Sequence, residues 1–314
     1  MKVYVKTPAR LHFGLIDLNG NLGRIFGGLG VGIDRPNFVL EAQPSEKLIA
    51  TGEKTEQIRA LAKRFLEIYG INANAQINVK QTIPEHSGLG SGTQLALAVA
   101  TALSKLFNVD ASTQALAEAM GRGQRTSVGT TIFERGGFVV DGGKSKTGFP
   151  TTILRQPFPN NWVFVVAVPN VKKGLAKNEE NAAFGALTPM TVEEAGRMCR
   201  LTMMKLLPSL VERDITSFGE ALTHIQTVIG GYFAEVQGGT FSSQATAKGI
   251  ELVQKLGAYG AGQSSWGPAF YGLTLREQAK EIKSKVQAYL GRSGGGQVFV
   301  AKANNRGAYI KVTK

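Results

Sequence analysis

Apolar residues recur at the helical spacing of three and four in several long segments of the chain. Residues 56–69 end before Gly70 and carry six apolar residues on one face: Ile58, Leu61, Ala62, Phe65, Leu66 and Tyr69. The same spacing predicts three further helices over residues 214–229, 243–256 and 276–290. Thr191 and Glu194 form a capping-box pair, which predicts a helix that begins there and ends before Pro208.

Short runs of β-branched and aromatic residues lie between these helices and predict strands. They cover residues 3–5, 38–41, 76–82, 162–168, 269–273 and 297–303. Strands and helices alternate irregularly, so we expect an α+β fold and not a doubly wound parallel sheet. A polar stretch over residues 155–161 predicts a boundary between two domains, 1–155 and 156–314.

The composition is that of a globular protein with room for two hydrophobic cores: 314 residues, 43% hydrophobic and 19% charged. Because Cys199 is the only cysteine, no intrachain disulfide can form, and three histidines argue against a zinc cluster. The sequence contains no signal-peptide pattern and no apolar stretch long enough to span a bilayer. We therefore expect a cytoplasmic protein that does not enter a membrane.

The net charge of +13 narrows the candidate partners. The basic residues are scattered, with no block of five or six, and no basic cluster alternates with aromatic residues as in RNA-binding modules. We expect this charge to serve small phosphorylated substrates and not a specific nucleic acid, although solubility alone and a basic RNA-binding module both stay open as alternatives.

A glycine-rich loop between a predicted strand and a predicted helix carries the strongest chemical signal. It consists of Ser87, Gly88, Leu89, Gly90, Ser91, Gly92 and Thr93. Glycines let backbone N–H groups approach an anion closely, and the N-terminus of a helix adds unpaired donors. The Ser91 hydroxyl can bind a phosphate oxygen or a divalent cation. The loop matches neither the dinucleotide fingerprint nor the P-loop, and a plain glycine turn is the alternative.

The segment at residues 84–93 (PEHSGLGSGT) resembles the phosphate loop of the GHMP kinase superfamily. Residues 8–14 (PARLHFG) resemble its N-terminal motif, and residues 260–268 (GAGQSSWGP) resemble its C-terminal glycine-rich motif. The resemblance implies a two-domain GHMP-kinase-like fold, with a ribosomal-protein-like N-terminal domain and a ferredoxin-like C-terminal domain.

One position departs from the kinases of that superfamily. The segment at residues 127–130 (SVGT) places Thr130 where those kinases carry an aspartate that orients or deprotonates the acceptor hydroxyl. Asp141 lies eleven residues further along and could substitute for it, so an ATP-dependent small-molecule kinase stays open as an alternative.

Four runs together are similar to the β-ribofuranosylaminobenzene 5′-phosphate synthase family: residues 16–20 (IDLNG), 90–94 (GSGTQ), 121–123 (GRG) and 136–143 (GGFVVDGG). The resemblance implies phosphoribosyl transfer from 5-phosphoribosyl diphosphate to 4-aminobenzoate or 4-hydroxybenzoate. It further implies that carbon dioxide and diphosphate are released and that the reaction belongs to the biosynthesis of methanopterin. It also implies Mg²⁺ as cofactor and allows a homodimer. The residues at 124–126 (QRT) depart from the smaller residues expected there.

We assign candidate roles to the polar residues of these motifs. The catalytic candidates are Asp17, Arg24, Arg122 and Asp141. The candidates for binding substrate or phosphate are the seven loop residues above together with Arg10, His12, Arg125, Ser264, Ser265 and Trp266, and Ser91 is the candidate ligand of Mg²⁺. The structural alternatives are surface ion pairs for the arginines, a buried neutral side chain for His12 and a turn cap for Asp17.

Overall fold

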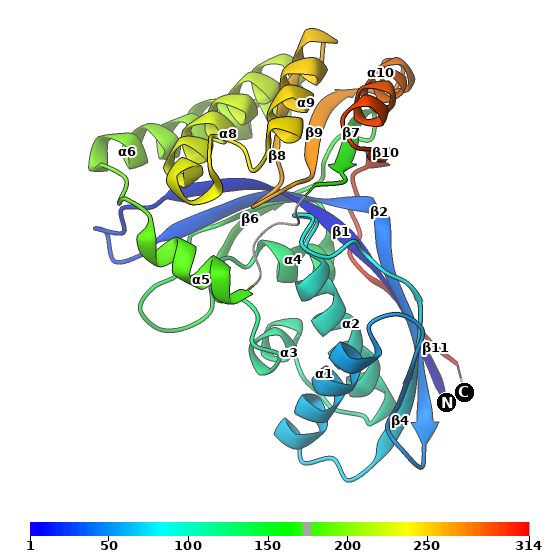
Figure 1. Cartoon of the computed structure of the whole chain (residues 1–314). Helices are drawn as coiled ribbons and strands as arrows, with labels where there is room; N and C mark the ends of the chain where they lie inside the picture. The colour runs from blue at the N-terminus through cyan, green and yellow to red at the C-terminus, as the bar shows by residue number, and fades with distance from the viewer. Residues whose placement is uncertain (172–176, 314) are drawn as a thin grey trace.

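Two long antiparallel strands run through the centre of the molecule (Figure 1). They are β1 (Lys2–Asp17) and β2 (Phe26–Ser45), and both contain bulges, one of them between His12 and Gly14. The computed structural model describes residues 1–171 and 177–313. Bulges bend a strand and re-aim its side chains, and this one lies where β1 passes the candidate site.

The first sheet has seven strands, in the order β11-β1-β2-β4-β3, with β5 paired to β2 and β6 paired to β5. The further strands are β3 (Ile49–Thr51), β4 (Asn74–Gln81), β5 (Phe138–Asp141), β6 (Thr152–Gln156) and β11 (Tyr309–Thr313). Four helices cover one face: α1 (Thr55–Ile68), α2 (Ser91–Leu106), α3 (Thr113–Ala119) and α4 (Val128–Arg135). The alanine-rich helix α2 packs against β1 and β2 and is buried on nearly all sides.

The second sheet has four antiparallel strands, in the order β10-β7-β9-β8. These are β7 (Trp162–Pro169), β8 (Gly260–Gln263), β9 (Phe270–Leu275) and β10 (Gly296–Lys302). The helices of this half are α5 (Lys177–Ala186), α6 (Val192–Leu201), α7 (Leu207–Glu212), α8 (Ile215–Gln237), α9 (Gln244–Lys255) and α10 (Ala279–Arg292). Helix α8 contacts both β8 and β1, so it joins the two halves of the molecule.

The α+β class is confirmed, and the predicted helices and strands lie within or overlap observed elements. The cap is also present, because the Thr191 hydroxyl accepts the Glu194 N–H at 3.1 Å. The predicted helix end before Pro208 is wrong. The chain continues through a π-helical turn (Thr202–Leu206) into α7, and Pro208 lies in the first turn of α7.

Strand β11 lies in the first sheet although it comes at the end of the chain. Lys2 pairs with Thr313, so the two ends of the described chain lie side by side (Figure 1). The division at residue 155 stays a prediction. Among the described residues, no helix combines the length and the apolar character needed to cross a membrane.

Candidate functional site

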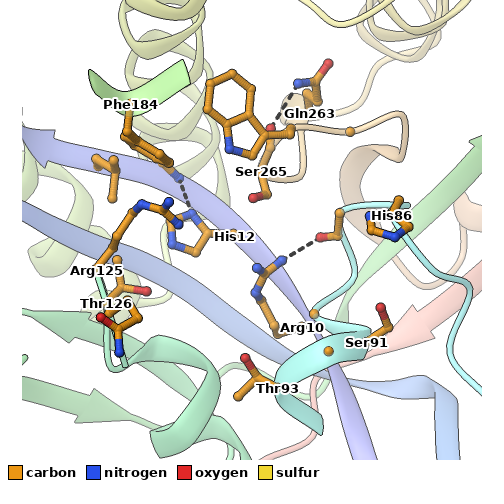
Figure 2. Close-up of a pocket in the computed structure, with 18 of the residues that line it drawn as sticks. Arg10, His12, His86, Ser91, Thr93, Arg125, Thr126, Phe184, Gln263 and Ser265 are labelled. Carbon is orange, nitrogen blue, oxygen red and sulfur yellow. Dashed lines mark hydrogen bonds between the residues drawn. The ribbon is translucent and has the colours of Figure 1, made fainter. Parts of the chain in front are cut away.

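A pocket of about 600 Å³ lies between the two halves of the molecule. Its walls come from β1, the loop before α2, the segment at residues 121–126, α5, α8 and the loop after β8. Figure 2 shows Phe184 and Arg125 on one side and His86 and Ser91 on the other, with His12 and Arg10 between them. The volume is in the usual range for a small-molecule site.

Three segments that are distant in sequence meet at the carbonyl oxygen of Gly88. The Arg10 guanidinium on β1 donates to this oxygen at 2.5 Å, and the Ser264 hydroxyl after β8 donates to it at 2.6 Å. A Cβ atom on Gly88 would lie 2.0 Å from the Ser264 carbonyl oxygen, so the close approach requires glycine. The N-terminal motif, the loop and the C-terminal motif therefore form one structure.

The loop ends at the N-terminus of α2 without a side-chain cap. Gly90 is the N-cap residue, with φ of 81°, a conformation that favours glycine. Ser91, Gly92 and Thr93 follow in the first helical turn and line the pocket. Since the first N–H groups of a helix have no intrahelical acceptor, this turn directs donors and the positive end of the helix dipole at the pocket.

The pocket is cationic. Arg10, Arg122 and Arg125 all line it. Among the lining residues that the structure describes, Glu85 is the sole carboxylate, and its charge is balanced by Lys54, whose Nζ lies 2.6 Å away. An anionic ligand is therefore favoured electrostatically.

His12 lies in this pocket as a neutral imidazole. Burial, assisted by the neighbouring charge of Arg10, lowers the pKa of His12 to about 3. The Gly14 N–H donates to Nδ1 of His12 at 3.2 Å, so the proton of the neutral ring is on Nε2. His12 can therefore donate a hydrogen bond, but it carries no charge near neutral pH.

Three aromatic side chains form another part of the lining: Phe184 on α5, Phe233 on α8 and Trp266 in the loop after β8. Trp266 was among the predicted residues, and it is 6% exposed. The two phenylalanines were not predicted, because each lies in a helical segment whose contacts with Trp266 arise only in the folded chain. Gln226 and Thr126 also line the pocket unpredicted.

Two candidate catalytic residues, Asp17 and Arg24, lie outside the pocket lining, and their catalytic roles stay predictions. The carboxylate of Asp17 caps the turn after β1 by accepting the N–H groups of Asn19 and Gly20, at 2.7 and 2.9 Å. The guanidinium of Arg24 donates to the carbonyl oxygens of Gly142 and Gly143, at 2.7 and 2.9 Å. Both side chains therefore hold backbone segments in position through hydrogen bonds.

Asp141 is also outside the lining, and it is fully buried. Its carboxylate accepts backbone N–H groups from Gly28, Ser127 and Gly143 at 2.8–2.9 Å. Burial raises the pKa of Asp141, although these donors oppose the effect. A carboxylate enclosed in this way cannot reach an acceptor hydroxyl, so the geometry argues against Asp141 as the base of a kinase.

The loop residues divide into those that face the pocket and those that hold the loop. Gly88, Gly90, Ser91, Gly92 and Thr93 belong to the lining. Ser87, Leu89 and Ser264 do not; Leu89 is in the hydrophobic core, and the Ser87 hydroxyl donates to the Pro84 carbonyl oxygen at 2.7 Å. Ser265 and Trp266 do line the pocket, beside Gln263. The ligand contacts of all these residues stay predictions.

Comparisons with known protein families and structures identify the superfamily of the chain. The model for the GHMP kinases N terminal domain matches residues 56–133, and the model for the GHMP kinases C terminal domain matches residues 206–292. A homoserine kinase structure from Cytophaga hutchinsonii has a TM-score of 0.71, with 18% identity, and the match covers 99% of this chain and 97% of that one. The fold and both domain matches define a member of the GHMP kinase superfamily.

Two curated archaeal relatives identify the family within this superfamily. Beta-ribofuranosylphenol 5′-phosphate synthase from Archaeoglobus fulgidus is 36% identical over 98% of this chain and 99% of the relative. The protein of the same name from Methanothermobacter thermautotrophicus is 32% identical over 99% of both chains. Within the superfamily, the chain belongs to the beta-ribofuranosylphenol 5′-phosphate synthase family.

Proposed function

We propose that the protein transfers the phosphoribosyl group of 5-phosphoribosyl diphosphate to the ring of a 4-substituted benzoate, with loss of diphosphate and CO2. The observation that carries the proposal is the pocket itself. It combines a helix N-terminus with three arginines, and the one carboxylate among its described lining residues, Glu85, is paired with Lys54. Such a site suits a polyanionic donor and a reaction that needs no general base.

The reaction begins at the anomeric carbon of the donor. The C1–O bond breaks, and its electron pair departs with diphosphate, which leaves an oxocarbenium-like ribosyl group. The ring carbon that bears the carboxylate supplies an electron pair to C1 and forms the new C–C bond. The bond to the carboxylate then breaks, its electron pair restores the aromatic ring, and CO2 leaves. No proton has to be removed from the ring.

Several groups of the chain can serve these steps. The first turn of α2, with Arg10 and Arg122, can bind the phosphate groups and stabilise the negative charge that develops on the departing diphosphate. His12 can add a neutral donor through Nε2. Charge-assisted hydrogen bonds of this kind are stronger than neutral ones, so the arginines should dominate the binding of the donor.

The name of the relatives suggests the acceptor. A ribofuranosylphenol is the product that decarboxylative transfer gives from 4-hydroxybenzoate, whereas 4-aminobenzoate gives the aminobenzene analogue. We therefore expect 4-hydroxybenzoate as the first acceptor to test and 4-aminobenzoate as its comparison.

Mg²⁺ is part of the proposal. The described residues contain no group of three or more His, Cys, Asp or Glu side chains that could hold a metal ion. This fits Mg²⁺ that binds mainly through substrate phosphates, as this ion often does, with the Ser91 hydroxyl as the expected protein ligand. When bound, the ion would neutralise charge on the diphosphate.

The test is an assay of the full chain with 5-phosphoribosyl diphosphate, Mg²⁺ and 4-hydroxybenzoate labelled in the carboxyl group. We expect CO2 and diphosphate in equal amounts. Phenol lacks the carboxylate and should release no diphosphate, because its intermediate would have to lose a proton, and Glu85, the one carboxylate among the described lining residues, is paired with Lys54. Comparable release with phenol would contradict the decarboxylative mechanism.

A matched pair of variants tests the pocket. Removing the charge of Arg122 in Arg122→Gln should lower kcat/KM by roughly ten- to a hundredfold, the effect of a lost charge-assisted pair. Arg59→Gln removes an exposed arginine of α1 that is outside the lining and should have no effect. Equal activities would exclude this pocket as the donor site.

A further inference from the structure

We infer that Phe184, Phe233, Trp266 and Arg125 form the binding site for the acceptor ring, which we call the acceptor wall. The inference rests on the proposed function and deepens it, because it gives the acceptor a defined place in the pocket. The ligand class that this wall fits is a planar aromatic carboxylate.

The three rings form one contiguous apolar surface. The ring centroids of Phe233 and Trp266 are 4.5 Å apart, those of Phe184 and Trp266 are 5.4 Å apart, and those of Phe184 and Phe233 are 5.7 Å apart. All three residues line the pocket. An aromatic ligand can stack on such a surface or meet it edge to face, and both arrangements are favourable for aromatic pairs.

Packing contacts with neighbouring residues hold the acceptor wall in position. Phe26 contacts Phe184 edge-on, with ring centroids 5.6 Å apart, so the ring of Phe184 is packed on more than one side. Phe184, Phe233 and Trp266 come from three separate elements, α5, α8 and the loop after β8. A surface whose rings fix one another needs little reordering when a ligand binds.

Arg125 adds a cation to this apolar surface. The centre of its guanidinium lies 4.1 Å from the centroid of the Phe184 ring, a cation–π contact. Gly123, two residues before Arg125, packs closely on Phe149. A Cβ atom at Gly123 would lie 1.9 Å from the Phe149 ring. This contact fixes the backbone that carries Arg125. A guanidinium beside an aromatic surface can bind the carboxylate of a ring that lies against that surface.

The wall and the phosphate loop lie on different sides of the same pocket. In Figure 2, Phe184 and Arg125 are on the side opposite Ser91 and His86. A donor with its phosphates at the start of α2 would extend its anomeric carbon towards the middle of the pocket, where His12 lies. An acceptor on the wall would approach that carbon from the other side, as a displacement requires.

The experiment measures binding of 4-hydroxybenzoate to the full chain by calorimetry, with ribose 5-phosphate and diphosphate present so that no reaction can occur. Phe233→Leu should weaken binding roughly tenfold, because it removes an aromatic face. Tyr232→Leu is the matched control, since this neighbour on α8 is also half-buried but is outside the lining. Binding of diphosphate alone should not change in either variant. Equal affinity of Phe233→Leu and the wild type for the arene would overturn the inference.

Two ligands test the wall without altering the fold. The saturated analogue trans-4-hydroxycyclohexanecarboxylate keeps the carboxylate and the hydroxyl on a non-planar ring, and it should bind the wild type far more weakly. Phenol keeps the ring without the carboxylate, so Arg125→Gln should weaken 4-hydroxybenzoate and leave phenol unchanged. Tight binding of the saturated analogue, or an equal effect of Arg125→Gln on both ligands, would contradict the assignment.

Failure of the wall and failure of the proposed function give different results. If the wild type binds 4-hydroxybenzoate through the wall but releases neither CO2 nor diphosphate, the acceptor site stands and the reaction is wrong. If product forms and Phe233→Leu keeps the KM of the wild type for the arene, the reaction stands and the wall is wrong.

Discussion

The imidazole of His12 shows how one residue of the pocket couples folding to pH. Its pKa in the folded chain is about 3, below the ordinary value of 6.5. The unfolded chain therefore binds a proton below pH 6.5 that the folded chain does not bind. His12 thus reduces the free energy of unfolding as the pH falls from 6.5 towards 3, by at most about 1.4 kcal/mol per pH unit, and has no such effect above 6.5.

The variant His12→Gln removes this titration. Between pH 7.5 and pH 5, the wild type should lose about 2 kcal/mol more unfolding free energy than the variant, as measured by urea denaturation at both pH values. His224→Gln, which alters an exposed histidine of α8, is the control and should behave as the wild type. If His12→Gln and the wild type lose the same amount, His12 is not the buried neutral base described above.

Single residues also show where sequence reasoning reached its limit. The phosphate loop could be predicted because glycine spacing and helix start are local signals, and residues 88 and 90–93 do line the pocket. The role of Asp141 could not be predicted in the same way. Its carboxylate binds the N–H groups of Gly28 and Ser127, which come near it only when β2, β5 and the start of α4 assemble.

Among the elements, helix α8 depends on a close contact with β8. A Cβ atom on Gly219 would lie 2.0 Å from the carbonyl oxygen of Tyr259, so only glycine allows this approach. Two turns or more along the same helix, Gln226, Ile229 and Phe233 line the pocket. The contact at Gly219 therefore sets the position of the side of the pocket that α8 forms.

Gly219→Ala should push α8 away from β8. We expect the free energy of unfolding to fall by about 1–3 kcal/mol, as for other overpacked sites, and the KM for the arene to rise. Gly231→Ala is the control on the same helix. A Cβ atom there meets nothing within 4 Å, so the variant should gain up to about 1 kcal/mol of stability from helix propensity. Urea denaturation and steady-state kinetics measure both effects, and a neutral Gly219→Ala would contradict the contact.

Helices whose apolar residues recur at a regular spacing could be predicted from the sequence. Elements that depend on contacts with segments distant in the sequence could not. In helix α1, and also in helix α8, apolar residues recur on one face in consecutive turns. Strand β11 and helix α5 gave no comparable signal. The residues of β11 are all exposed, and the strand exists because it pairs with β1 at the other end of the chain. The position of Phe184 on α5 depends on contacts with Phe26, Phe233 and Trp266.

The whole molecule has the fold of a kinase superfamily, but a fold does not determine a reaction. Neither Thr130, which stands where the kinases carry an aspartate, nor Asp141, the possible substitute, is placed to act as a base. Thr130 is buried in α4 outside the pocket lining, and Asp141 is enclosed by backbone donors. We therefore expect no ADP above background when the protein is incubated with ATP, Mg²⁺ and homoserine or another alcohol.

A homoserine kinase assayed under the same conditions serves as the positive control. Steady ADP formation by this chain would contradict the prediction. Loss of that activity in Asp141→Asn would then identify Asp141 as the base.

The carbonyl oxygen of Gly88 has a consequence for heat inactivation. Many enzymes lose activity below the temperature at which they unfold, because the site opens locally first. Here the loop is bonded through one atom to Arg10 on β1 and to Ser264 after β8, so it cannot open without loosening the contact between the two halves. We therefore expect the loop to open on heating only when the junction between the halves loosens, so that activity and native structure are lost together.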